Sequence, residues 1–157
     1  MRLGISAQLI IVVVISVFSG CSATGPRFDL AKAEVVPPTG SQLYVFRESA
    51  FIESGTYPVV LLDGRETGDL RNGGYLVTQL DPGSHELLVQ SGGMLRGQWI
   101  HGPPRLLLDA EPGKRHYVQV SLRTTGVSEN IMYRGASVFE VSESTALKSL
   151  SELSLSK

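Results

Sequence analysis

The stretch YPVVLLDGRETGDLRNGGYLVTQLDPGSHELLV, residues 57–89, decides the fold. Apolar runs of strand length are interrupted there by three turn signals, Asp63-Gly64, Asn72-Gly73-Gly74 and Asp81-Pro82-Gly83. Glycine adopts positive φ at little cost, proline presets φ, and Asp or Asn hydrogen-bonds within its own turn. The stretch therefore predicts four short strands that fold back on one another, at Val59 to Leu62, Arg65 to Leu70, Tyr75 to Leu80 and His85 to Gln90.

Apolar periodicity predicts further strands on both sides of this stretch. Gln42 to Arg47 is apolar on both faces, which is typical of a strand inside a sheet. After it we expect strands at Arg105 to Ala110, at His116 to Leu122 and at Ala136 to Val141, with a loop over Thr124 to Gly135.

The C-terminal segment Ser142 to Leu153 predicts a short helix, since Leu147, Leu150 and Leu153 have helical spacing behind serines that can cap it. About eight strands and one helix indicate an all-β domain over residues 41–157. We expect an antiparallel β-sandwich or an open barrel with this helix at its C-terminus.

Two turns share one pattern, an acidic residue followed by Pro-Gly and then a histidine. Asp81-Pro82-Gly83 precedes His85, and Glu111-Pro112-Gly113 precedes His116. The match predicts two similar β corners, one in each sheet, although it is too short to indicate a duplicated domain.

Composition narrows the class of protein. The 157 residues include 14 basic and 15 acidic residues, mixed along the chain, for a net charge of −1. This balance offers no basic face for nucleic acid and no acidic tail, so we expect no nucleic-acid partner. The length suits one domain.

Residues 1–21, MRLGISAQLIIVVVISVFSGC, have the layout of a secretory signal peptide. Arg2 supplies the positive end, an apolar run broken only by Ser16 extends from Leu9 to Phe18, and small residues follow. About 14 residues from Ile5 to Phe18 are too few to span a bilayer of roughly 30 Å.

The end of this segment, Phe18-Ser19-Gly20-Cys21, resembles the lipobox of bacterial lipoproteins, with Phe where Leu is usual. The resemblance implies that residues 1–20 are removed and that Cys21 becomes an acylated N-terminus, a membrane anchor carrying palmitate-type chains. Ser22, in place of Asp, implies the outer membrane of the cell envelope, facing the periplasm. An ordinary secretion signal with a chance cysteine is the alternative.

Residues 21–40 are expected to form the lipid anchor and a flexible tether, because they are rich in small residues and end in Pro37-Pro38-Thr39-Gly40. An edge strand at Ala33 to Val36 is the alternative. Cys21 is the only cysteine, so no disulfide can support the fold and thiol catalysis is excluded.

No catalytic or metal motif is present in the sequence. The three histidines have spacings that match no local ligand motif, so we expect no metal and no cofactor. G-x-S-x-G, phosphate-loop and dinucleotide signatures are absent, which indicates a protein that is not an enzyme. His85 and His116 are interpreted as imidazoles that bond to a turn backbone; a hydrolase would need one of them exposed near a serine and an acid.

Trp99, with His101 in the Gly-rich stretch 91–104, is the best candidate for contact with a glycan or peptide. The alternative is a tryptophan folded back over the edge of the sandwich. Phe51 and Tyr57, in the loop before the second strand, would add to a binding surface if the two loops are neighbours.

Five motifs in a fixed order resemble a bacterial envelope lipoprotein family that carries domain of unknown function 2846. They are LYVFR at Leu43 to Arg47, V-x-L-D-G at Val60 to Gly64, G-x-L-x-N-G-G-Y at Gly68 to Tyr75, P-G-x-H at Pro82 to His85, and E-P-G-K before a strand with Tyr117. The resemblance covers Ser41 to about Leu153. PEGA-type domains and the regulatory domain of carboxypeptidases share the P-G-x-H corner, so a similar β-sandwich is implied, but no activity.

These observations predict a lipid-anchored envelope lipoprotein that acts as a non-catalytic structural or binding accessory. Its partners would be the membrane and another envelope protein or a glycan. The alternative is a glycan- or peptide-binding module that acts through the Trp99 loop.

Overall fold

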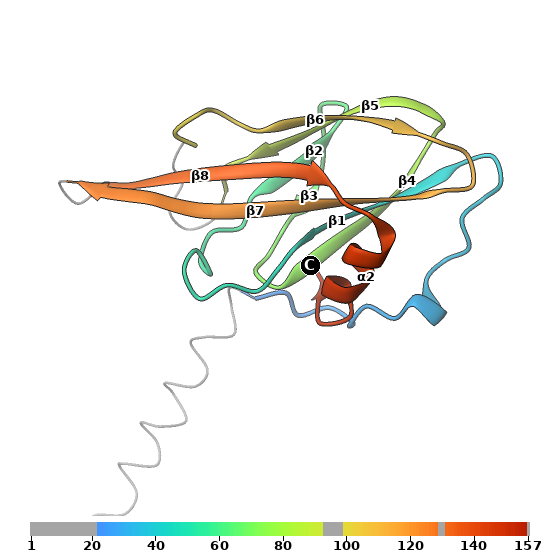
Figure 1. Ribbon diagram of the computed structural model, residues 1–157, viewed down its shortest axis with the longest axis horizontal. Coiled ribbons are helices and arrows are strands. Elements are labelled where there is room, and N and C mark those ends of the chain that lie inside the picture. The colour runs from blue at the N-terminus through green and yellow to red at the C-terminus, as the bar shows by residue number, and fades with distance from the viewer. Residues whose placement is uncertain (1–21, 93–98, 129–130, 157) are drawn as a thin grey trace, which may run out of the picture.

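Two β-sheets and a short helix make up the computed structural model, which describes residues 22–92, 99–128 and 131–156 (Figure 1). The strands are β1 (Ser41–Arg47), β2 (Val59–Leu62), β3 (Arg65–Asp69), β4 (Gly74–Leu80), β5 (Gly83–Gln90), β6 (Arg105–Ala110), β7 (Arg115–Ser128), β8 (Ile131–Glu140) and β9 (Ser154–Leu155). One sheet has the order β8-β7-β1-β4-β9 and the other the order β3-β2-β5-β6. The two sheets face each other and are not closed into a barrel, which confirms the predicted β-sandwich.

The hairpin between β2 and β3 confirms the Asp63-Gly64 turn. Asp63 has φ of 50° and Gly64 has φ of 76°, the pair of positive values that a tight two-residue hairpin turn requires. β2 also pairs with β5, with Val60 opposite Val89.

The prediction that the four strands of residues 57–89 fold back on one another is wrong for β4. This strand crosses to the other sheet and pairs antiparallel with β1, from Ser41 opposite Leu80 to Arg47 opposite Gly74. The chain crosses where Leu70 enters the core, fully buried, and Gly73, with φ of 64°, turns it into β4. Placing β4 in the five-stranded sheet lets the apolar faces of both sheets cover each other.

The two acid-Pro-Gly corners are the later crossings between the sheets. Asp81-Pro82-Gly83 leads from β4 to β5, and Glu111-Pro112-Gly113 leads from β6 back to β7. The two similar corners that we predicted are therefore present, but each of them connects the two sheets and neither lies within one sheet.

β1 is buried along its whole length, as predicted for an inner strand. Leu43 and Val45 lie in the core between the sheets, while Tyr44 and Phe46 lie in a second core on the other side of the five-stranded sheet. β1 pairs in parallel with β7, so the sandwich is not antiparallel throughout.

β7 and β8 form a long hairpin that the sequence did not predict. The expected loop over Thr124 to Gly135 is wrong, because both strands continue through it, with a register shift between Thr124 and Gly126. β-branched residues such as Thr124 and Thr125 suit strands. The extended part of the hairpin carries too few apolar residues to give an apolar period.

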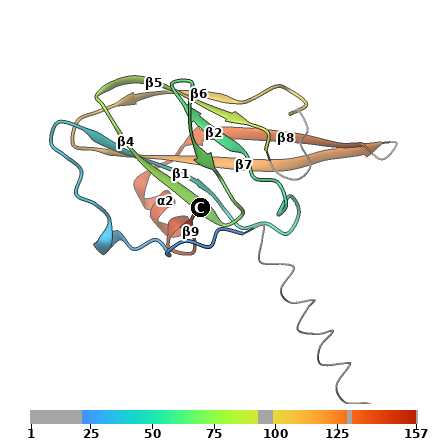
Figure 2. The same ribbon diagram turned by 180° about the vertical axis from the view of Figure 1, so that it is seen from behind.

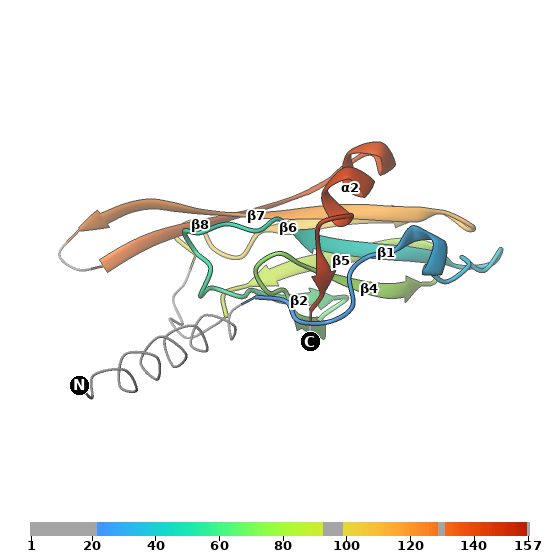
Figure 3. The same cartoon turned by 90° about the horizontal axis from the view of Figure 1, so that it is seen from below.

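The predicted C-terminal helix is α2 (Glu143–Leu150), and Ser142 caps it by accepting a hydrogen bond from the Thr145 backbone N–H. Ala146 and Leu150 bury its inner face on the second core, where Leu153 joins them. Figure 3 shows that α2 lies on one side of β7 and β1. No helix in the described ranges is long and apolar enough to cross a membrane.

The N-terminal segment from Ser22 packs against the domain. Ala23 donates to the Asn72 carbonyl at 3.0 Å and Gly25 donates to the Leu155 carbonyl at 3.0 Å. Phe28 packs edge-on against two tyrosine rings, Tyr44 and Tyr75, with centroids 5.6 Å away in each case. Figure 2 shows the segment running beside β9 and α2.

The flexible tether expected over residues 21–40 is therefore wrong for residues 23–32, which include the 3-10 helix η2 (Leu30–Lys32). The alternative edge strand at Ala33 to Val36 does not form either. The segment is ordered because Phe28 packs into the apolar core on the outer face of the five-stranded sheet, and because Arg27 forms a β-bridge with Ser154 of β9.

Phe28→Ala should lower the free energy of unfolding by about 2 kcal/mol, because it removes a ring that packs on two others. Leu30→Ala, in the same segment but 44% exposed, is the control and should cost less than about 0.5 kcal/mol. Urea unfolding of the chain that begins at residue 21 measures both. Equal values for the two variants would show that the segment does not pack on the sheet.

Candidate functional site

Both corner histidines bond to the backbone of their own turn, as predicted. His85 Nε2 lies 2.8 Å from the Asp81 carbonyl oxygen, and His116 Nε2 accepts from the Glu111 N–H at 3.3 Å. The second ring nitrogen of each faces a carboxylate: His85 Nδ1 lies 2.6 Å from Asp63 Oδ2, and His116 Nδ1 lies 3.0 Å from Glu140 Oε1. With both nitrogens engaged, neither imidazole has the free nitrogen that a catalytic base needs.

The Asp63 carboxylate changes the titration of His85. Its hydrogen bond, with that of the Asp81 carbonyl, raises the pKa of His85 above the ordinary 6.5, and His85 in turn lowers the pKa of Asp63 below 3.8. A raised histidine pKa contributes stability that is complete below the unfolded value and is lost as pH rises through the folded value. The Asp63 contribution is present above its unfolded pKa and is lost as pH falls through its lowered one.

The coupling between Asp63 and His85 should therefore be larger at pH 6 than at pH 9. A double-mutant cycle with Asp63→Asn and His85→Gln, followed by denaturant unfolding at both pH values, measures it. His101→Gln, at an exposed turn position, is the control and should change stability equally at both pH values. A coupling energy that does not vary with pH would contradict the ion pair.

Glu53 has its carboxylate buried, 3% exposed, in the loop between β1 and β2. Arg134 Nε lies 3.2 Å from Glu53 Oε2, Thr56 Oγ1 donates to the same oxygen at 2.8 Å, and Thr124 Oγ1 donates to Oε1. Glu53 itself has φ of 68°. The loop is therefore tied to the β7–β8 hairpin by a buried ion pair.

Arg47, the last residue of the LYVFR motif, also holds the loop between β1 and β2 in place. Its guanidinium donates to the Glu53 carbonyl at 2.7 Å and to the Thr56 carbonyl, and the residue is 3% exposed. Burial lowers the pKa of Arg47 to about 10, while the Glu53 charge opposes the shift, so the group stays protonated at neutral pH. A strand-end arginine thus supplies the donors that order the loop.

The structure makes the two predicted loops neighbours. Ile100 donates to the Arg134 carbonyl at 2.9 Å, and Arg134 pairs with Glu53, so both loops meet on one residue of β8. Phe51 in the first loop is 95% exposed, whereas Trp99 in the second is 5% exposed and donates through Nε1 to the Val89 carbonyl at 3.0 Å.

The predicted binding residues are therefore placed differently from one another. Phe51 and His101 are exposed, and Tyr57 is half-buried with the Arg71 guanidinium 5.1 Å from its ring centroid. Trp99 is folded back over the edge of the sandwich, which was the alternative interpretation. Its ring lacks the open face that stacking on a sugar requires. Cys21 lies outside the described residues.

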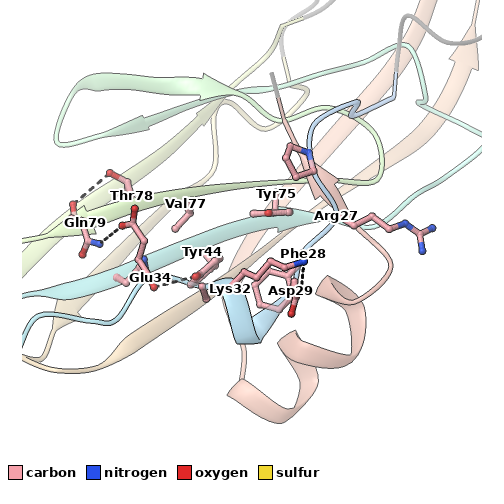
Figure 4. Close-up of a pocket in the computed structure, with 13 residues that line it drawn as sticks. Arg27, Phe28, Asp29, Lys32, Glu34, Tyr44, Tyr75, Val77, Thr78 and Gln79 are labelled. Atoms are coloured by element: carbon pink, nitrogen blue, oxygen red, sulfur yellow. Dashed lines mark hydrogen bonds and ion pairs between the residues drawn. The ribbon is translucent and has the colours of Figure 1, made fainter.

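A groove of about 550 Å³ lies between the N-terminal segment and the outer face of β1 and β4 (Figure 4). Tyr44 and Tyr75 are at its base, with Phe28 packed against both. The acids that line it already have partners: Asp29 pairs with Lys32 at 3.0 Å, and Glu34 accepts from Gln79 at 3.4 Å. Such a groove can bind a ligand, but its lining offers no paired nucleophile and base.

Within residues 22–92, 99–128 and 131–156, no group of three or more His, Cys, Asp or Glu side chains could hold a metal ion. The residues that sequence reasoning missed are Glu53, Arg134 and Asn72. Asn72 accepts from the Ala50 N–H at 2.9 Å through its side chain and from Ala23 through its carbonyl. In the sequence, Asn72 was interpreted only as a turn residue, and its bonds to Ala50 and Ala23 become visible only in the fold.

Glu53→Ala should cost about 3 kcal/mol of unfolding free energy, because it leaves the Arg134 charge buried without this carboxylate. Hydrogen exchange at Ala50 should also speed up, since the loop loses its tie to the hairpin. Glu48→Ala, an exposed carboxylate at the start of the same loop, is the control and should cost less than about 1 kcal/mol. Unchanged exchange at Ala50 in Glu53→Ala would contradict this role.

Comparison with known proteins gives one family. The family model described as a protein of unknown function (DUF2846) matches residues 39–137, which include β1 to β7 and most of β8. The match ends at residue 137, before α2, whereas the predicted resemblance extends to about Leu153. No curated protein matches the chain. Since the match spans more than half of the sequence, the chain belongs to the family of proteins of unknown function DUF2846.

Proposed function

We propose that the protein is a lipid-anchored lipoprotein of the bacterial cell envelope, a non-catalytic accessory that binds or supports other envelope components. The observation that carries the proposal is the segment MRLGISAQLIIVVVISVFSGC, residues 1–21. A positive end, a short apolar run and small residues before a cysteine are what a lipoprotein signal peptide needs.

The anchoring step is chemically simple. The Cys21 thiolate attacks the glycerol carbon of a membrane phospholipid and forms a thioether to the diacylglyceryl group, while the phosphate head group leaves. Water then hydrolyses the peptide bond between Gly20 and Cys21, which frees an α-amino group that can take a further acyl chain from a second phospholipid. Each buried CH₂ contributes about 0.8 kcal/mol, so two or three palmitate-type chains hold a protein on a membrane stably. Ser22 favours the outer membrane, with the domain facing the periplasm.

The packing of the domain supports the proposal that the protein is stable outside the cytoplasm without a disulfide. Two apolar cores, one on each face of the five-stranded sheet, bury the large side chains of β1. The fold therefore does not depend on oxidation of the single cysteine, which leaves Cys21 available for lipid.

A binding role through the Trp99 loop has less support, because the indole ring is buried. A hydrolase function has even less support, since the ring nitrogens of His85 and His116 are all engaged in hydrogen bonds.

The P-G-x-H corner at the start of β5 supports a likeness to PEGA-type domains, which act as small β-sandwich modules. An envelope protein or glycan is the proposed partner beside the membrane.

Cys21→Ser should deplete the protein from the outer-membrane fraction and leave it as the longer chain that keeps residues 1–20, because the hydroxyl cannot take the place of the thiol in the alkylation that precedes cleavage. Fractionation of cells that express the full chain, with detection of the protein in each fraction, measures this. A Ser19→Ala variant keeps a small residue before the cysteine and is the matched control, expected to stay on the membrane. Unchanged processing and unchanged membrane binding of Cys21→Ser would contradict lipidation at this residue.

A further inference from the structure

The loop between β1 and β2 presents two large apolar side chains to solvent, Phe51 with 95% and Ile52 with 67% of its surface exposed. Isolated exposed apolar residues need no explanation, but two adjacent ones on a loop that is held in place do. The buried Glu53 pairs with Arg134, and the Arg47 guanidinium donates to two loop carbonyls. Buried charged groups therefore hold in place a loop whose outer side is apolar.

This loop lies directly beside the place where the anchor joins the domain. Ser22 forms a β-bridge with Asn72, and Ala23 donates to the Asn72 carbonyl at 3.0 Å. The Asn72 side chain accepts from the Ala50 N–H at 2.9 Å, and Phe51 is the next residue. Ser22, which directly follows Cys21 in the sequence, therefore lies against the same Asn72.

Other exposed apolar side chains lie at the same end of the sandwich. Ile100, 47% exposed, is bonded through its backbone to Arg134, and Tyr133, 39% exposed, is the residue before Arg134. In Figure 1 the loop after β1 and the start of the described chain lie at the same end of the molecule. Val35, by contrast, is 87% exposed in the segment that leads into the opposite end of β1.

We propose that Phe51 and Ile52 insert into the lipid surface beside acylated Cys21 and fix the orientation of the domain on the membrane. The proposal rests on the lipid anchor proposed above. The chain from Ala23 onward is hydrogen-bonded to the domain, so no free tether separates this end from the bilayer. A bilayer is then the surface that a loop next to the anchor meets first, and aromatic and aliphatic side chains are those that enter its interface.

The orientation has a consequence for the remainder of the domain. The two histidine corners lie at the end of the strands opposite Phe51, since β5 and β7 both begin there. A domain seated on Phe51 and Ile52 would hold these corners away from the membrane, toward the periplasm.

The test places a reporter on the loop. Phe51→Trp and the matched control Val35→Trp are made in the acylated mature protein and reconstituted in vesicles of phosphatidylethanolamine and phosphatidylglycerol. Trp99, 5% exposed, adds the same background to both and is subtracted with the unsubstituted protein. Both sites are exposed, so neither substitution disturbs a core. Brominated phospholipids, which quench tryptophan that enters the acyl region, should reduce the Phe51→Trp emission about twofold and leave Val35→Trp unchanged.

Flotation of the unsubstituted protein with vesicles separates this proposal from the anchor. If it does not float, or floats as Cys21→Ser does, the anchor and the membrane contact fall together. If it floats in a Cys21-dependent way but the Phe51→Trp emission is quenched no more than that of Val35→Trp, only the membrane contact is overturned. Shielding of Phe51→Trp that needs high protein concentration and no lipid would assign the loop to a second copy instead, and would equally overturn it.

Discussion

The structure depends on one constraint, the burial of both faces of β1. Leu43 and Val45 require one apolar cover and Tyr44 and Phe46 require another, so the five-stranded sheet must be packed on both sides. The four-stranded sheet supplies the first cover. The helix α2 and the N-terminal segment with Phe28 supply the second. Because that segment begins with Ser22, the residue after Cys21, the same packing that completes the fold also places the start of the described chain against the domain.

The strands themselves could be predicted from residues such as Leu43 to Arg47 and Val59 to Leu62, where period and turn signals agree. The assignment of strands to sheets could not. β4 leaves the hairpin of β2 and β3 because sheet membership depends on how faces cover each other, which local patterns do not encode. The β7–β8 hairpin beyond Thr124 was missed for a related reason: its apolar residues, Val127 and Ile131 to Tyr133, do not alternate with the period of a strand.

The candidate site shows the same division. The corner role of His85 and His116 followed from their position after Pro-Gly, because a strand start leaves few other partners. Glu53 looked like an ordinary loop carboxylate, and its pairing with Arg134, 81 residues away by their numbers, exists only in the fold. The exposure of Phe51 and the burial of Trp99 likewise result from tertiary packing. They make the Phe51 loop a better candidate for contact with a partner than the Trp99 loop, which the sequence favoured.

The proposed attachment of the domain to a membrane depends on acylation of Cys21. Intact mass spectrometry of the protein purified from the membrane fraction tests it most directly. We expect a mature chain that lacks residues 1–20 and carries a diacylglyceryl group on the Cys21 sulfur, with or without an amide-linked acyl chain on its α-amino group. A mature chain with an unmodified Cys21 thiol, or one that begins at another residue, would contradict it.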